Sequence, residues 1–137
     1  MVNYTQPRDG KMNGSETVAG PGYILKVGGG TNDLSVGTAG AVALGISAGE
    51  SERAAGGALD TSAASVSFLP VGGVLMVQAT ASQGWAVGAQ VYAGASGLAT
   101  TSNGSSAKKL GLYVGPGETV PAAGGMIPVN TMGAEQA

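Results

Sequence analysis

The most constraining feature of this chain is the stretch from Gly84 to Gly115, which alternates short β-type runs with glycine-rich turns. An alternating run ends at Tyr92, a Gly/Ser turn occupies residues 94–97, and a polar run follows at Leu98–Thr101. After a loop, Leu110–Val114 is apolar. This order of strand, tight turn, strand, loop and strand is typical of a small antiparallel barrel or sandwich. The sequence therefore predicts an all-β fold.

Composition supports a folded β-rich chain over the other glycine-rich classes. Glycine makes up 26 of the 137 residues, and only 10% of the residues are charged. Low charge with ordinary hydrophobicity argues against disorder, and the absence of a three-residue glycine period argues against collagen. The length fits one domain. With one Trp and one Phe, we expect a core of Val, Leu, Ile, Ala and Met.

Three parts are expected along the chain. Residues 1–19 are polar and read either as an extended N-terminal arm that a neighbour orders or as a frayed terminus. Residues 20–130 form the β-barrel or sandwich, and residues 131–137 form a polar C-terminal tail. Besides the opening stretch, the expected strands are residues 23–27, 34–36, 41–46, 66–70, 71–81, 118–120 and 126–129, the last two forming a hairpin.

The longest expected strand is recognised by its alternation. Alternation over residues 71–81 places Val71, Gly73, Leu75, Val77 and Ala79 on one side, and the pair at 72–73 predicts a bulge or bend. Two short segments of the sequence are similar to each other: A-V-A-L-G-I at 41–46 and A-K-K-L-G-L at 107–112. This internal similarity indicates either two similar β units or chance in a Gly/Ala-rich chain.

Several classes of chemistry lack their usual residues. The chain has no His, the common general base and metal ligand, and no Cys for thiolate chemistry or disulfides. A net charge of −2 argues against a phosphate-binding footprint. No apolar run approaches the ~18 residues of a membrane span, and the first residues lack the apolar segment of a signal peptide. We therefore predict a non-enzymatic protein made in a cytoplasm, with no cofactor, metal, nucleic acid or membrane partner.

Two local patterns have a structural interpretation. Gly28-Gly29-Gly30 lacks the spacing and the Lys-Ser/Thr pair of a phosphate-binding loop, so it predicts a turn. Glu50, Glu52 and Asp60 would be a divalent-ion cluster only with closely spaced oxygen ligands, and their spacing favours a solvated loop.

The aromatic residues separate into core and contact candidates. Trp85 alternates with Val87, which favours burial over an exposed anchor at an interface. Tyr4 lies in the polar arm without a local core, so it is the better candidate for an intermolecular anchor. Tyr23, Tyr92 and Tyr113 fall in expected strands and are assigned structural roles.

The pattern V-G-A-Q-V-Y-A-G-A-S-G-L-A-T-T over residues 87–101 resembles a hairpin of the small capsid decoration (cement) proteins of tailed double-stranded DNA phages, in particular the Gly/Ala-rich group of β-barrel head-stabilising proteins. Leu110-Gly111-Leu112 is similar to the family's hydrophobic-glycine-hydrophobic strand. Val42–Ile46 and Gly73–Val77 fall in the expected order, and Asn3–Pro7 looks like the family's N-terminus. Residues 47–65 and 103–109 lie outside the resemblance.

The resemblance implies a structural role on a virion. Such proteins bind the outer surface of the expanded capsid, commonly as homotrimers, and bridge neighbouring major capsid subunits against the pressure of packaged DNA. Residues 1–19 would extend onto the capsid or a neighbouring protomer, adding a strand to a sheet edge, and deleting residues 1–15 would weaken binding without unfolding the domain. The contact residues expected in this arm are Tyr4, Gln6, Pro7 and Arg8.

Two alternatives stay open at this point. The first is a secreted or tail-associated β-sandwich adhesin that binds a glycan, in which exposed aromatic side chains line a groove and Trp85 fluorescence responds to sugar. The second is an enzyme subunit whose catalytic residues come from a partner.

Overall fold

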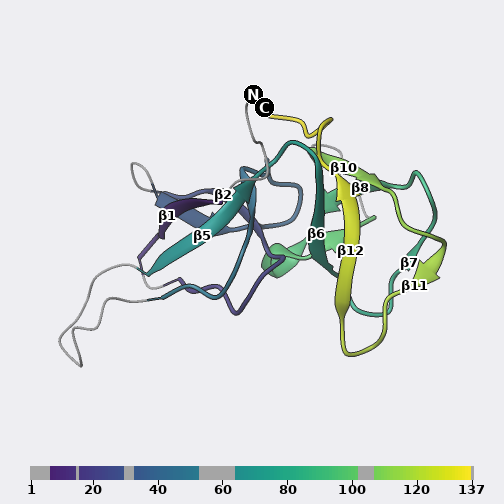
Figure 1. Cartoon of the computed structure of the whole chain (residues 1–137), viewed down its shortest axis with the longest axis horizontal. Coiled ribbons are helices and arrows are strands. Elements are labelled where there is room, and N and C mark those ends of the chain that lie inside the picture. The colour runs from purple at the N-terminus through teal and green to yellow at the C-terminus, as the bar shows by residue number, and fades with distance from the viewer. Residues whose placement is uncertain (1–6, 15, 30–32, 53–63, 102–106, 137) are drawn as a thin grey trace.

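Two closed five-stranded sheets lie next to each other in the computed structural model of this chain (Figure 1). The structure describes residues 7–14, 16–29, 33–52, 64–101 and 107–136. Every regular element in these ranges is a strand except one 3₁₀ turn, η2, at Ala95–Gly97. The all-β prediction is therefore confirmed, with two barrels in place of the single barrel or sandwich expected from the sequence.

The first barrel is built from the N-terminal half of the chain. Its strands follow the order β1-β3-β2-β4-β5, and all neighbours are antiparallel except the parallel pair β1 and β3. Gly45 permits the close approach of β4 and β5, because a Cβ there would lie 2.6 Å from the carbonyl oxygen of Leu69. The strands are β1 (Arg8–Met12), β2 (Ile24–Val27), β3 (Asp33–Val36), β4 (Gly45–Ser47) and β5 (Ser65–Pro70).

The second barrel contains the stretch that organises the sequence, in the strand order β10-β12-β6-β9-β8. The predicted hairpin forms, since β8 pairs antiparallel with β9 across η2, and β10 then pairs with β8. A separate two-stranded sheet joins β7 (Gly84–Trp85) to β11 (Glu118–Thr119). The barrel strands are β6 (Val74–Ala79), β8 (Gln90–Ala93), β9 (Ala99–Thr100), β10 (Lys109–Tyr113) and β12 (Gly125–Asn130).

The long strand expected at 71–81 begins only at Val74. Gly72 and Gly73 have φ angles of 135° and 133°, so the predicted bend lies where the two glycines stand. The predicted alternation is confirmed from there on, because Leu75, Val77 and Ala79 share one face of β6, which is buried.

Two expectations about the strands, one about pairing and one about length, need correction. The hairpin between residues 118–120 and 126–129 does not form, because β12 pairs with β6 on one edge and β10 on the other, which leaves no edge for β11. The strand expected at 41–46 is also shorter, since only its end belongs to β4.

The packed part of the chain begins earlier than the predicted boundary at residue 20. Strand β1 pairs with β5 and β3, and Met12 and Val18 are 0% and 2% exposed. Among the described residues, 8–14 and 16–19 are therefore part of the first barrel and not an arm. Deleting residues 1–15 would remove a barrel strand, so an arm of that kind is limited to residues 1–6, which lie outside the described residues.

The core of the second barrel continues into the first. Its cluster of buried residues takes in Ile24, Ala43 and Ile46 from the N-terminal half together with strands of the C-terminal half. A smaller cluster around Met12, Leu25 and Leu34 fills the first barrel. The shared cluster joins the two barrels through packed apolar side chains. Nothing helical in the described chain has the length and apolarity that crossing a bilayer requires.

Candidate interaction surface

The outer side of the sheet β6-β12-β10 carries mostly apolar side chains, with Gln78 and Asn130 as polar members. Residues directly opposite each other in neighbouring strands point to the same face, and Val74 lies opposite Asn130, which lies opposite Leu112. Met76 lies opposite Pro128 in the next row, and the Val114 amide donates to the Pro128 carbonyl. We call this surface the apolar face; its apolar members are Val74, Met76, Leu112, Val114, Met126 and Pro128.

The side chains of the apolar face are open to solvent. Val74 is 56% exposed, Met76 51%, Val114 46% and Leu112 40%. The intervening residues on the same strands, such as Val77 and Val129, are fully buried in the barrel. Antiparallel strands with one solvated face normally alternate apolar and polar residues, whereas strands covered on both faces read as continuous apolar runs. The run V-L-M-V in β6 is of the second kind, although its outer face is open to solvent in the described chain.

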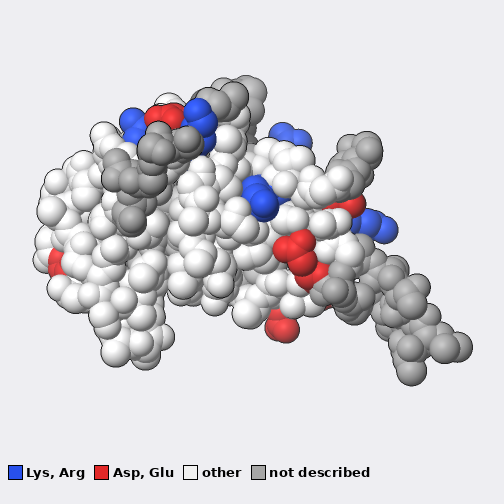
Figure 2. Space-filling view, turned by 180° about the vertical axis from the view of Figure 1, so that it is seen from behind, with Lys and Arg blue, Asp and Glu red and all other residues white. Residues whose placement is uncertain are grey.

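Charged side chains are nearly absent from the apolar face. Strands β6 and β12 carry none, and Lys109 stands at the start of β10. The whole stretch 61–107 of the sequence has no charged residue. Figure 2 shows the other side of the molecule, seen from behind relative to Figure 1, and there charged side chains are scattered over one half and lie mainly at the rim of the other. An uncharged apolar surface of this kind is typical of a contact with protein.

A groove of 370 Å³ adjoins the apolar face along β6. Val74 and Met76 form one wall, and Pro7 and Leu69 come from the first barrel. Gly22 lines the groove with a φ of 95°, a backbone conformation that side chains rarely adopt, and a Cβ there would lie 3.1 Å from the backbone nitrogen of Gln78. The lining also includes Pro21, Gly22, Ser47, Ala48, Leu75 and Met126, and none of its residues is charged.

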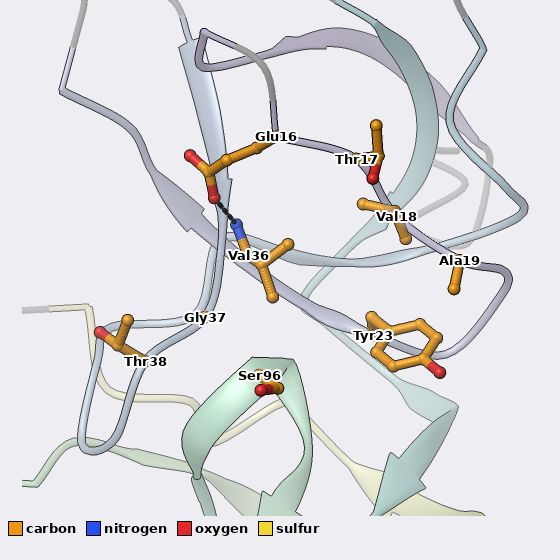
Figure 3. Close-up of a pocket in the computed structure, with 9 residues that line it drawn as sticks. All are labelled: Glu16, Thr17, Val18, Ala19, Tyr23, Val36, Gly37, Thr38 and Ser96. Atoms are coloured by element: carbon orange, nitrogen blue, oxygen red, sulfur yellow. Dashed lines mark hydrogen bonds between the residues drawn. The ribbon is translucent and has the colours of Figure 1, made fainter.

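A second cavity, of 410 Å³, opens between the barrels beside η2 (Figure 3). Both carboxylate oxygens of Glu16 are engaged on its rim, one by the Ser35 hydroxyl at 2.8 Å and one by the Val36 amide at 3.2 Å. Tyr23 and Ser96 line the opposite part. These two hydrogen bonds of Glu16 hold the segment before β2 against β3. The lining combines one engaged carboxylate with hydroxyl and apolar groups, which is not a nucleophile–base arrangement.

The acidic residues near β4 and β5 line a third cleft, of 470 Å³. Glu50, Glu52 and Asp9 of β1 all line it, and Asp9 accepts a hydrogen bond of 2.8 Å from Ser67. Asp60, the third member of the cluster considered from sequence, lies outside the described residues. Within the described residues, no three acidic, His or Cys side chains come close enough to hold a metal ion.

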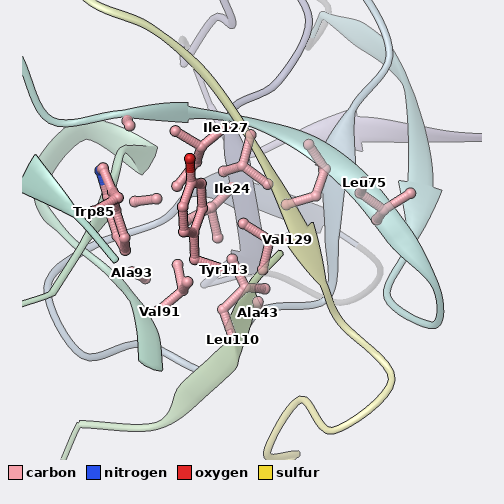
Figure 4. Packing of buried hydrophobic residues seen from close by; sticks show 14 of the residues in the cluster. Ile24, Ala43, Leu75, Trp85, Val91, Ala93, Leu110, Tyr113, Ile127 and Val129 are labelled. Carbon is pink, nitrogen blue, oxygen red and sulfur yellow. The ribbon is translucent and has the colours of Figure 1, made fainter. Parts of the chain in front are cut away.

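Trp85 and Tyr113 pack together inside the second barrel (Figure 4). Their ring centroids are 5.6 Å apart, and Trp85 is 3% exposed. The predicted burial of Trp85 is confirmed, whereas Val87 is 70% exposed because β7 ends at Trp85. The Trp85 side chain therefore offers no surface to a sugar.

We expect the ionisation of Tyr113 to weaken the fold in alkali. Burial raises the pKa of its hydroxyl above 10.0, and the hydrogen bond to Glu118, 3.1 Å long, and the charge of Glu118 raise it further. Above about pH 10, the unfolded chain releases this proton while the folded chain retains it, so stability falls as pH rises. Below that pH the contribution is fully present.

The measurement is the melting temperature across the alkaline range for the wild type and Tyr113→Phe. The variant should lose less stability between about pH 9 and 11 than the wild type. Equal slopes for the two proteins would contradict the assignment. Absorbance of the phenolate at alkaline pH gives an independent titration of the folded protein.

The four contact residues expected from sequence have different places. Tyr4 and Gln6 lie outside the described residues. Pro7 is exposed and lines the groove along β6. Arg8 is exposed at the start of β1, opposite Phe68.

The apolar face was not predicted from the sequence. Its signal is present in V-L-M-V at 74–77, where Val74 and Met76 alternate with the residues that were predicted to share one face of the strand. The chain matches no protein-family model and none of the curated proteins.

Proposed function

We propose that this chain is a structural protein that docks onto a larger protein assembly through its apolar face. The observation that carries the proposal is the set of exposed apolar side chains on three adjacent strands without charge on β6 or β12. Monomeric proteins rarely expose a contiguous apolar surface of this type to water. The shared core of the two barrels supports the role, because it lets the molecule present this surface as one packed body.

The assembly that we propose is the expanded head of a tailed double-stranded DNA phage. This part rests on the resemblance of residues 87–101 and 110–112 to the cement proteins. The chain would lie on the outer capsid surface, as a homotrimer, and bridge neighbouring major capsid subunits. Such a role requires no catalytic group, cofactor or metal. Many equal contacts on a lattice act together, so each contact need only be weak.

The test is to mix the purified chain with expanded, undecorated capsids of its own virus. We expect the protein to sediment with the particles in a fixed ratio and to raise the temperature at which they break. Light scattering of the free chain gives its mass, which reports whether trimers exist before binding. Absence of binding to expanded capsids would contradict the capsid role, and binding to unexpanded shells alone would contradict the requirement for expansion.

A further inference from the structure

One edge of strand β6 carries backbone groups that no strand of the described chain pairs. Met76 lies opposite Pro128 in β12, and proline has no amide hydrogen to donate. That pair exchanges no hydrogen bonds, so the amide and carbonyl of Met76 point to the other edge of β6. Because backbone groups along an antiparallel strand alternate between its two neighbours, those of Val74 point the same way, whereas Leu75 and Val77 bond to β12.

The rest of the described chain reaches this edge only at its far end. The Gln78 amide donates to the Gly22 carbonyl at 2.7 Å, and β9 pairs with β6 at Ala79 alone. Among the described residues, no strand stands beside Val74 or Met76 on this side. Natural proteins commonly protect such an edge with a charged side chain, a proline or a bulge. The strand V-L-M-V-Q-A has none of these, so its edge can accept a strand from another chain.

The groove of 370 Å³ lies along the same edge. Val74 and Met76 line it from β6, whereas Ala48 and Leu69 line it from the first barrel. When a strand is added to a sheet, main-chain hydrogen bonds supply affinity, and pockets for alternate side chains supply specificity. Since none of the lining residues is charged, a charged side chain that entered the groove would find no partner there. The site therefore favours an extended segment with uncharged, apolar side chains.

The extent of the site is also defined. It begins at Val74, where β6 starts, and ends at Gln78, whose amide the Gly22 carbonyl already occupies. This stretch is about 13 Å long, which is room for an added strand of about four residues. The groove is continuous with the apolar face, because Val74, Met76 and Met126 belong to both.

We propose that β6 accepts a short, extended and uncharged segment of the capsid subunit as an added strand. Its backbone pairs with Val74 and Met76, and its alternate side chains enter the groove. This inference rests on the proposed function, since it names the part of the capsid that the site takes. It adds orientation to the contact, because apolar packing is non-directional, whereas the pairing of strands sets a register.

The first test is residue-resolved amide hydrogen exchange on the free chain and on the chain bound to expanded capsids. We expect the Val74 and Met76 amides to exchange about 10-fold more slowly in the bound protein, since each gains a hydrogen bond. The amides of Leu75 and Val77 bond to β12 in both states and are the internal controls. Binding to capsids without this protection would overturn the strand addition and leave the capsid role intact.

A pair of variants separates backbone pairing from side-chain packing. Met76→Pro removes the amide hydrogen at the open edge and places a ring there, but it spares the bonds to β12. Met76→Ala removes the same side chain and keeps the amide. We expect Met76→Pro to bind capsids roughly 10-fold more weakly than Met76→Ala. Equal binding by the two variants, with the Val77 amide still protected as evidence of folding, would overturn the proposal.

A synthetic peptide tests the edge without capsids. The probe is acetyl-T-V-T-V-T-amide, an uncharged strand former, at millimolar concentration, and its control is the same peptide with every backbone amide N-methylated. We expect only the unmethylated peptide to slow exchange of the Val74 and Met76 amides, by roughly 2- to 5-fold. This result without binding to capsids would show that the capsid role is wrong and the edge site is right. Failure of both peptide and capsids to protect the edge would overturn both. Protection already present in the free chain would also overturn the proposal, because the chain itself or a second copy would then fill the edge.

Discussion

Replacing Met76 by lysine is expected to lower the affinity for expanded capsids by roughly 100-fold per site. Met76 lies in the middle of the apolar face, between Pro128 of β12 and the groove. The substitution removes an apolar side chain from the proposed contact and places an unpaired charge there, which is costly to bury. Since the loss is repeated at every lattice site, decoration should fail altogether at low protein concentration.

The fold should tolerate this change. Met76 is 51% exposed and points away from the core, and substitutions at such positions usually alter stability by less than about 0.5 kcal/mol. The matched control is Val27→Lys, since Val27 is 66% exposed on β2, outside the apolar face. Sedimentation with capsids and thermal melting are measured for both variants. Wild-type binding by Met76→Lys, or equal loss in both variants, would contradict the assignment of the apolar face.

Replacing Gly111 by alanine is expected to destabilise the second barrel by about 3 kcal/mol. A Cβ at this position would overlap the carbonyl oxygen of Asn130 in β12 and lie 3.0 Å from a methyl group of Val129. Asn130 is held between β10 and β6, so its backbone cannot move aside without breaking strand pairs. We expect the melting temperature to fall by roughly 10 °C.

Gly84→Ala is the control for the loss of a glycine as such. Its Cβ would meet nothing closer than the Thr119 hydroxyl at 3.8 Å, and Gly84 is exposed in β7. We expect a change within about 1 kcal/mol, in either direction. Denaturant or thermal unfolding of both variants gives the comparison. A Gly111→Ala protein as stable as Gly84→Ala would show that β10 and β12 can separate at this point without cost.

The local patterns were readable from the sequence because they depend on neighbouring residues. Alternation predicted that Leu75 and Val77 share one face of a strand, and the glycine-rich turn predicted the β8–β9 hairpin. The absence of His and Cys narrows the possible chemistry through composition alone. These inferences need only the two-residue period of a strand and the reactivity of single side chains.

Strand partners and the exposed surface were decided by tertiary structure alone. Nothing in the local sequence indicates that β1 pairs with β5, more than fifty positions away. Nor does it indicate that β12 pairs with β6 and β10, or that β11 pairs with β7. The sequence by itself determined that β6 is apolar on both faces. Only the closure of the barrels decided which face is buried and which faces water, because strands far apart in the chain must meet before either side of β6 is covered.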